Sequence, residues 1–394
     1  MSTIERGTAT GVWFALTEEQ KALRELAREF AEKEIRPKER EYDEKMQHPA
    51  DVIAKAHEVG LMNLYVSEEY GGLGLSSFDG MLVGEELNWG CSGIGTSVSA
   101  NGLGSAPVLL FGSDEQKAAW LPPLVESPIL CSFGLSEPGA GSDVASLKTT
   151  AVREGDEYVL NGSKTFITNA GYAAWTVVFA KTDARGGSKG MSAFIVPMDA
   201  PGVSIETHLE KMGQRATDTS AFALQDVRVP AANRIGEEGD GFKIAMATLD
   251  FTRPGTAIGA VGVAQAAYEH SVAYAKERIT FDMPIAMHQG VNFMIADMAT
   301  EIEAARLLTW QASWMLDQGY GRKATLYSSF AKRFAADMAM KVTTDAVQVF
   351  GGYGYMKEYP VEKLMRDAKL FQIYEGTSQI QRLVIAKEIF LPKD

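Results

Sequence analysis

The sequence predicts an α+β protein of three parts: an N-terminal helical domain, a middle antiparallel β-sheet domain and a C-terminal helical bundle. Three observations support this order. Residues 1–130 repeat apolar side chains at helical spacing, residues 131–236 contain short β-branched and aromatic runs between turn residues, and residues 237–394 return to long helical periods. The 394 residues are enough for two or three domains with a large core.

The N-terminal domain opens with a helix start. Thr17 and Gln20 have the spacing of a capping box, apolar residues recur at helical intervals behind them, and Pro37 is the expected end of this helix. Further helices are expected over residues 51–59, 78–87 and 114–120, the last stopped by Pro122 and Pro123, and the glycines of residues 71–74 indicate a loop.

The middle domain begins near Cys131 and ends near Pro230. Within it, strand-like residues 157–160 and 164–168 flank Asn161 and Gly162, a pair typical of a two-residue hairpin turn. The β-branched and aromatic content of the neighbouring runs predicts a small antiparallel sheet. Its other strands are expected over residues 175–180, 193–196, 203–205 and 221–224.

The C-terminal domain contains long periodic segments, which are typical of a bundle of antiparallel helices. Ser378 and Gln381 have capping-box spacing at the start of the last of them. The helices are expected over residues 258–278, 289–316, 324–350 and 377–390.

Composition and charge disfavour several function classes. A net charge of −13 and a pI of about 5.0 are unsuited to binding nucleic acid or an anionic membrane. No apolar run is long enough for a transmembrane helix, and residues 1–6 show no secretory signal. Cys91 and Cys131 form no disulfide framework, so we expect a reducing, cytoplasmic location. The five histidines lack metal-ligand spacing, so no metal site is expected.

Residues 371–382 contain the strongest candidate for catalysis. Glu375 has apolar and aromatic neighbours, Gly376 follows it directly, and a helix is expected to begin next. A carboxylate on such a bend acts as a general base if its pocket is dry. Glycine removes side-chain bulk, so a flat ligand can approach the backbone there. The alternative is an exposed glutamate in the first helical turn.

Several blocks of the chain share one family resemblance. Residues 371–382, together with residues 71–74, 136–143, 213–215 and 348–352, closely resemble the acyl-CoA dehydrogenases, and in particular the medium-chain type, in the same order and spacing. The resemblance runs from Thr17 to Glu388 and implies the three-part layout. It further implies that Glu375 removes the α-proton of a fatty acyl-CoA thioester while a β-hydride leaves to FAD. The products are then a trans-2-enoyl-CoA and reduced flavin.

The loop of residues 139–143 alone predicts either a turn or a nucleotide site. It lacks the lysine of a P-loop, and strands rather than a helix follow it, so it is no Rossmann fingerprint. The resemblance implies that it binds FAD, with the Thr168 hydroxyl near N5. The chain has Phe166, Phe133 and Ser136 where medium-chain enzymes usually have Trp, Tyr and Thr. The implied FAD contacts on this side are Phe133, Leu135, Ser136, Ser142, Phe166, Ile167, Thr168, Thr377 and Gln379.

A second group of residues resembles the family's contacts to the FAD of a neighbouring subunit. From the sequence alone, Arg278 pairs with a pyrophosphate or complements a helix dipole. The resemblance couples FAD binding to assembly and implies a homotetramer. The group comprises Arg278, Thr280, Phe281, His288, Gln289, Gln348, Gly351 and Gly352.

The substrate site is expected around Glu375. Asp250 and Arg253 either form a structural ion pair at i, i+3 spacing or act near Glu375 or the CoA chain. In isovaleryl and long-chain members the base lies at the position of Thr252, and threonine cannot serve as that base. By resemblance, the backbone N–H of Glu375 and a ribityl hydroxyl of FAD polarise the thioester carbonyl. The remaining implied substrate contacts are Ser142, Tyr374, Gly376, Gly95 and Ser99.

The expected activity is FAD-dependent dehydrogenation of a fatty acyl-CoA, with electrons passed to an electron-transfer flavoprotein. Gly95 and Ser99 are smaller than their usual counterparts, which favours medium over very short chains, and branched or aromatic acyl groups remain open. Two alternatives stand beside this reading. The first is an acyl-CoA oxidase that uses oxygen, and the second is a non-catalytic FAD-bearing assembly protein.

Overall fold

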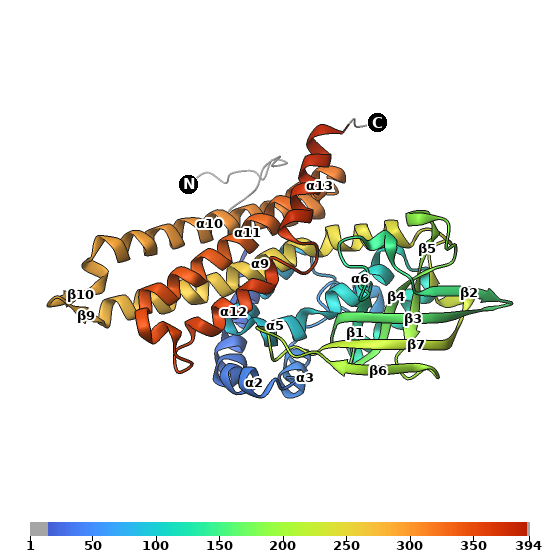
Figure 1. The fold of residues 1–394 in the computed structure, drawn as a ribbon, viewed down its shortest axis with the longest axis horizontal. Helices are drawn as coiled ribbons and strands as arrows, with labels where there is room; N and C mark the ends of the chain where they lie inside the picture. Colours follow the sequence, from blue (N-terminus) through green and yellow to red (C-terminus); the bar gives the residue numbers. More distant parts are fainter. Residues whose placement is uncertain (1–14, 392–394) are drawn as a thin grey trace.

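The computed structural model describes residues 15–391, and the N-terminal third of it is helical (Figure 1). Thr17 caps the first helix with Gln20 in a capping box, as the sequence predicted. Pro37 does not end the helical path, because it lies at the start of a 3₁₀ turn, where proline is tolerated. The helices are α1 (Glu18–Phe30), α2 (Glu39–Lys45), α3 (Ala50–Glu58), α4 (Ser77–Gly90), α5 (Ser92–Ser99), α6 (Asn101–Phe111), α7 (Asp114–Trp120) and α8 (Pro122–Glu126).

The two prolines after α7 both end one helix and begin the next. Pro122 and Pro123 follow α7 as expected, but they also open α8, because a proline at the first helical position gives up no hydrogen bond. The reading of residues 1–6 lies outside the described residues. Both cysteines are free and buried.

The middle of the chain forms one mixed sheet. Its strand order is β6-β7-β3-β2-β4-β5-β8, with β1 beside β4. The expected antiparallel sheet is therefore only partly right, since β1 and β2 both pair with β4 in parallel. The strands are β1 (Leu130–Gly134), β2 (Thr150–Glu154), β3 (Glu157–Thr168), β4 (Ala173–Lys181), β5 (Met191–Pro197), β6 (Val203–His208), β7 (Thr219–Pro230) and β8 (Arg234–Ile235).

The predicted hairpin at Asn161 and Gly162 is wrong. These residues lie inside β3, which runs on past them and pairs with β7 through a register shift at this point. The Asn161 side chain bonds to Asp226 on β7, with its Nδ2 3.1 Å from Oδ1. A Cβ on Gly162 would lie 2.7 Å from the Cα of Thr149, so glycine here allows close approach of the backbone. The pair therefore marks a bulge rather than a turn.

The C-terminal part is a bundle of long helices. The first of them begins 17 residues before the expected Ile258 and continues through Pro254. The last begins at Ser378 with Thr377, not Ser378, as its N-cap, and the Thr377 hydroxyl accepts the Ile380 N–H at 3.1 Å. The elements are α9 (Gly241–Glu277), β9 (Ile279–Thr280), β10 (Met283–Pro284), α10 (Gln289–Asp317), α11 (Arg322–Phe350), α12 (Val361–Phe371) and α13 (Ser378–Phe390).

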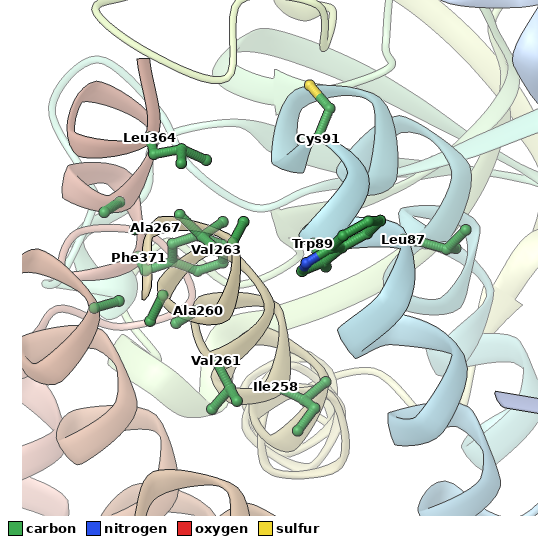
Figure 2. Packing of buried hydrophobic residues seen from close by; sticks show 14 of the residues in the cluster. Leu87, Trp89, Cys91, Ile258, Ala260, Val261, Val263, Ala267, Leu364 and Phe371 are labelled. Carbon is green, nitrogen blue, oxygen red and sulfur yellow. The ribbon is translucent and has the colours of Figure 1, made fainter. Parts of the chain in front are cut away.

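One buried core joins the two helical parts. Figure 2 shows Leu87 of α4 and Ile258 of α9 in this cluster, together with Phe371 of α12. Helix α9 packs against helices of both parts and so connects them. Figure 1 shows α9, α10 and α11 side by side, with the sheet at one end and the β9–β10 ribbon at the other. Segments distant in sequence thus meet along α9.

Candidate functional site

A cavity of about 780 Å³ lies where the sheet, the N-terminal helices and α9 meet the α12–α13 turn. Its wall includes Glu375 together with the loop after β1 and the end of β3. The predicted site residues that line it are Phe133, Leu135, Ser136, Ser142, Phe166, Ile167, Thr168, Arg253, Tyr374, Glu375, Gly376, Thr377 and Ser99. The fold therefore brings the predicted base and one of the two predicted flavin regions to the same hollow.

The turn that carries Glu375 has a strained backbone. Glu375 has φ +50° and Gly376 has φ +88°, a region that costs a non-glycine residue free energy. A Cβ on Gly376 would lie 2.6 Å from Nε2 of Gln381, so glycine is needed here for conformation and for packing inside the protein. The expected approach of a flat ligand is a different reason for the glycine and stays a prediction.

Two side chains hold this turn from behind. The ammonium group of Lys332 on α11 donates to the carbonyl oxygen of Gly376 at 2.6 Å, and Nε2 of Gln381 donates to the same oxygen at 3.1 Å. Lys332 is fully buried, and burial lowers its pKa to about 8. Nothing in the sequence singles out Lys332, because a lysine among small residues is typical of an ordinary helix.

Thr252 on α9 contacts the predicted base directly. Its hydroxyl donates to Oε2 of Glu375 at 2.8 Å. A hydrogen bond to a carboxylate favours its ionised form and restricts its rotation. Threonine, which was excluded as a base, therefore positions Glu375.

The predicted Asp250–Arg253 ion pair is present, and Arg253 lies near the predicted base. Arg253 is 3% exposed and pairs with Asp250, whose other oxygen accepts from Thr325 at 2.8 Å. Arg253 also lines the cavity, whereas Asp250 does not. The structural ion pair is thus confirmed, while a role near Glu375 or the CoA chain stays a prediction for Arg253, whose charge interacts with that of Glu375.

The loop after β1 and the end of β3 together present three hydroxyl groups to the cavity. Within residues 15–391, the side chains of Ser136, Ser142 and Thr168 make no hydrogen bond with the protein. The ring of Phe133 stands nearby, packed edge-on against Phe179 at 5.0 Å between centroids. Unused polar groups beside apolar walls suit a planar ligand with several hydrogen-bonding atoms.

A buried ion pair fixes this loop to the sheet. Lys164 is 0% exposed, and its ammonium group contacts Oε1 of Glu137 at 2.8 Å and the carbonyl oxygen of Phe179 at 2.7 Å. Burial lowers the pKa of Lys164 to about 8, while the Lys164 ammonium and several donors outweigh burial and lower the pKa of Glu137. Since Glu137 follows Ser136, the pair holds the loop hydroxyls in position.

Phe166 combines exposure with an unusual backbone. It is 69% exposed and has φ +60°. A large aromatic ring held in the left-handed region at a cavity rim is typical of a functional position.

The two predicted acyl-end residues are in contact, but only one of them lines the cavity. Ser99 lines the cavity and donates to the Gly95 carbonyl oxygen at 2.8 Å. Gly95 does not line it, because a Cβ there would lie 2.9 Å from the Leu87 backbone, so its role is close packing of α5 on α4. Tyr374 is enclosed, which raises its pKa, and its hydroxyl accepts from Nε2 of Gln214 at 3.4 Å.

The second predicted flavin group lies around the β9–β10 ribbon, at the end of the bundle opposite the sheet (Figure 1), and none of its residues lines the cavity. There Thr280 and His288 are hydrogen-bonding partners at 3.0 Å, and Arg278 lies over the Tyr353 ring at 5.5 Å. Arg278, Phe281, Gln289, Gln348, Gly351 and Gly352 are exposed. Gln379 is exposed on α13 and also lies outside the cavity lining. One chain therefore cannot bring both groups to one ligand by itself.

Residues 15–391 contain neither a cluster of metal ligands nor a membrane-spanning helix. No group of three or more His, Cys, Asp or Glu side chains could hold a metal ion. No helix in this range is long and apolar enough to cross a membrane.

Comparison with known families matches the three parts of the chain separately. The acyl-CoA dehydrogenase N-terminal, middle and C-terminal domains match residues 17–127, 132–227 and 239–390. These matches cover most of the chain and follow the order of the helical, sheet and helical parts.

Individual relatives match over nearly their whole length. A probable acyl-CoA dehydrogenase of Bacillus subtilis is 46% identical over 95% of this chain and 99% of its own. A short-chain specific acyl-CoA dehydrogenase of Clostridium acetobutylicum is 45% identical over 96% of this chain and 99% of its own. The butyryl-CoA dehydrogenase of Megasphaera elsdenii superposes with a TM-score of 0.94 at 42% identity, over 96% of this chain and 100% of its own.

Proposed function

This chain belongs to the acyl-CoA dehydrogenase family, and we propose that it removes hydrogen from the α and β carbons of an acyl-CoA thioester with Glu375 as the base. As a member of that family it is an oxidoreductase. One observation carries the assignment of the base: the Glu375 carboxylate, held by Thr252, lines the same cavity as the loop with unused hydroxyl groups.

The residues at that loop fit a flavin. The hydroxyls of Ser136, Ser142 and Thr168 have no partner within the described chain, and a Cβ on Gly141 would meet open space. A planar ring with carbonyl and nitrogen acceptors needs such donors and apolar walls such as Phe133. FAD, when bound there, supplies the two-electron acceptor for the hydrogen that leaves the β carbon.

The chain's own groups perform the proton chemistry. Thr252 orients the Glu375 carboxylate, and the buried Lys332 and Gln381 fix the turn that carries it. A thioester bound in the cavity excludes water from this carboxylate, which then takes the α-proton onto one of its oxygens. The backbone N–H of Glu375 is proposed to donate to the thioester carbonyl oxygen, where negative charge develops.

The proposed substrates are straight acyl-CoA esters of short to medium length. Two relatives are named for butyryl-CoA or for short-chain acyl-CoA, which favours shorter chains than the sequence alone suggested. Val98 and Ser99 line the cavity at the N-terminal helices, and Met81 and Leu87 extend it along α4. The space beyond Glu375 is thus apolar, as an acyl tail requires.

The exposed groups at the far end of the bundle support an assembly in which a second copy completes the cofactor site. We therefore propose a homotetramer in which Arg278, Thr280 and Phe281 contact the FAD of a neighbouring subunit. An electron-transfer flavoprotein is the proposed acceptor of the electrons. The free, buried Cys91 and Cys131 suit the proposed cytoplasmic location.

The test of the base is Glu375→Gln in the FAD-loaded protein. Gln has the same shape and keeps an oxygen for the Thr252 hydroxyl, so folding and ligand binding should persist. Anaerobic flavin bleaching by butyryl-CoA and octanoyl-CoA, followed by stopped flow, should slow by at least about 10²–10⁴-fold. Near-normal bleaching in this variant would refute the assignment, and an absence of bleaching in the wild type would refute the dehydrogenase function.

One observation keeps the oxidase alternative open. Phe166 replaces a larger residue of the medium-chain enzymes and is 69% exposed at the cavity rim, so it shields less of a ring bound there. Turnover with acyl-CoA should be measured with oxygen alone and with an artificial electron acceptor under nitrogen. Peroxide formed at the rate of acceptor reduction would identify an oxidase.

A further inference from the structure

On the basis of the function proposed above, we propose that Lys332 is a positioning residue for the base: its buried ammonium group fixes the Glu375–Gly376 turn and places a positive charge behind the Glu375 carboxylate. The lysine lies on α11 and reaches the turn between α12 and α13 from behind. It lines no part of the cavity, so it acts through Glu375 rather than on substrate.

The first supporting observation is the contact itself. The Lys332 ammonium donates to the Gly376 carbonyl oxygen at 2.6 Å, and that oxygen belongs to a turn with two successive positive φ angles. Such a turn persists only where its surroundings hold it in place. A neutral donor, Nε2 of Gln381, already reaches the same oxygen. Hydrogen bonding alone therefore does not explain why a charged group is buried there.

The second observation is that the charge of Lys332 is not neutralised locally. Within residues 15–391, no carboxylate oxygen lies within 4 Å of its ammonium group. Burying an ammonium group without a partner is costly, so such a group usually serves a purpose. Because burial lowers its pKa only to about 8, Lys332 still carries its charge at neutral pH.

Of the charged groups that face Lys332 within residues 15–391, Glu375 is the one that has no ion-pair partner. They are Glu375 on the turn, Arg253 on α9 and Asp337 on α11. Arg253 is paired with Asp250, and Asp337 is contacted by Arg382 at 2.8 Å and Arg333 at 3.5 Å. In the described part of the chain, no cation lies within 4 Å of the half-buried Glu375, and the charge of Arg253 is balanced by Asp250. Lys332 is therefore the facing cation whose charge is uncompensated.

Three variants separate charge from hydrogen bonding. Lys332→Gln keeps a donor and loses the charge, Lys332→Met loses both, and Lys332→Arg keeps the charge. The control is Lys341→Met, which removes a half-exposed lysine from the same helix, paired there with Glu301 and Asp345. Each variant is compared with the wild type as the FAD-loaded protein.

The first readout does not depend on activity. The infrared carbonyl band of a protonated carboxyl group that is missing in Glu375→Gln reports the proton on Glu375. In Lys332→Gln and Lys332→Met, this band should appear at higher pH than in the wild type, because a nearby positive charge favours the charged form of a carboxylate. Lys332→Arg and Lys341→Met should leave it in place.

The second readout is the rate of anaerobic flavin reduction by butyryl-CoA as a function of pH. Its acid limb should move upward with the infrared band in the Gln and Met variants. If the infrared band and the acid limb of Lys332→Gln stay at the wild-type pH, the proposal is wrong, whether or not Lys332→Met folds. If wild-type flavin is not reduced by any acyl-CoA while the infrared shift is present, the proposed function fails and the role of Lys332 stands.

Discussion

The contact between Thr252 and Glu375 permits a quantitative prediction for Thr252→Val. Valine has nearly the volume of threonine, so the change replaces one hydroxyl by a methyl group at the same place on α9. The lost interaction is a hydrogen bond of 2.8 Å from Oγ1 of Thr252 to Oε2 of Glu375, and it is the only side-chain hydrogen bond to this carboxylate within residues 15–391. The carboxylate therefore loses a donor that favours its charged form.

The size of the effect follows from the strength of such bonds. Hydrogen bonds to charged groups contribute about 1.5–3 kcal/mol, and 1.36 kcal/mol corresponds to a factor of ten in rate. Both side chains are half-buried, so we take the lower end of this range, about 1.5 kcal/mol or roughly tenfold. On the acid limb of its pH profile, flavin reduction should therefore slow by about that factor, while the plateau rate at high pH changes less.

The assay is single-turnover reduction of the bound flavin by butyryl-CoA in stopped flow, at closely spaced pH values. Thr325→Val serves as the matched control, because it removes a hydroxyl that contacts Asp250 at 2.8 Å and not Glu375. An acid limb that stays at the wild-type pH in Thr252→Val would show that the hydroxyl does not support the base.

Two more predictions concern the cavity and acid stability. Gly255→Val should lower the preference for octanoyl-CoA over butyryl-CoA by about tenfold in kcat/KM. Gly255 lines the cavity, a Cβ there would lie 3.8 Å from Met81, and the added isopropyl group should displace one or two methylenes of the acyl tail at ~0.8 kcal/mol each. An unchanged ratio would place the acyl tail elsewhere. Burial and the Arg36 guanidinium lower the pKa of His270 to about 4. Below pH 6.5 the unfolded chain therefore binds a proton that the folded protein does not bind. Stability is lost as the pH falls from 6.5 toward 4. Replacing His270 by Gln should therefore reduce the loss of unfolding free energy between pH 7 and pH 5 by about 2 kcal/mol, measured by urea denaturation, and an equal loss in both proteins would contradict the neutral buried histidine.

Local signals in the sequence determined much of this molecule. The capping box of Thr17 and Gln20, the end of α7 and the bounds of α10 and α11 depend on residues close together in the chain, so spacing alone predicts them. The bend at Glu375 was likewise readable, because a glycine and a helix start stand directly beside it. The Asn161–Gly162 pair misled for the same reason: a local turn signal cannot show that β7 pairs along the whole of β3.

Only the tertiary structure decided what surrounds the base. Thr252 lies 123 residues before Glu375, and Lys332 lies 44 residues before Gly376, so no spacing rule connects them. Their meeting depends on α9, α11 and the α12–α13 turn packing around one core, where burial lowers the pKa of Lys332 to about 8. Sequence alone singled out Glu375 as the candidate base, whereas the packing of distant helices created the environment of its carboxylate.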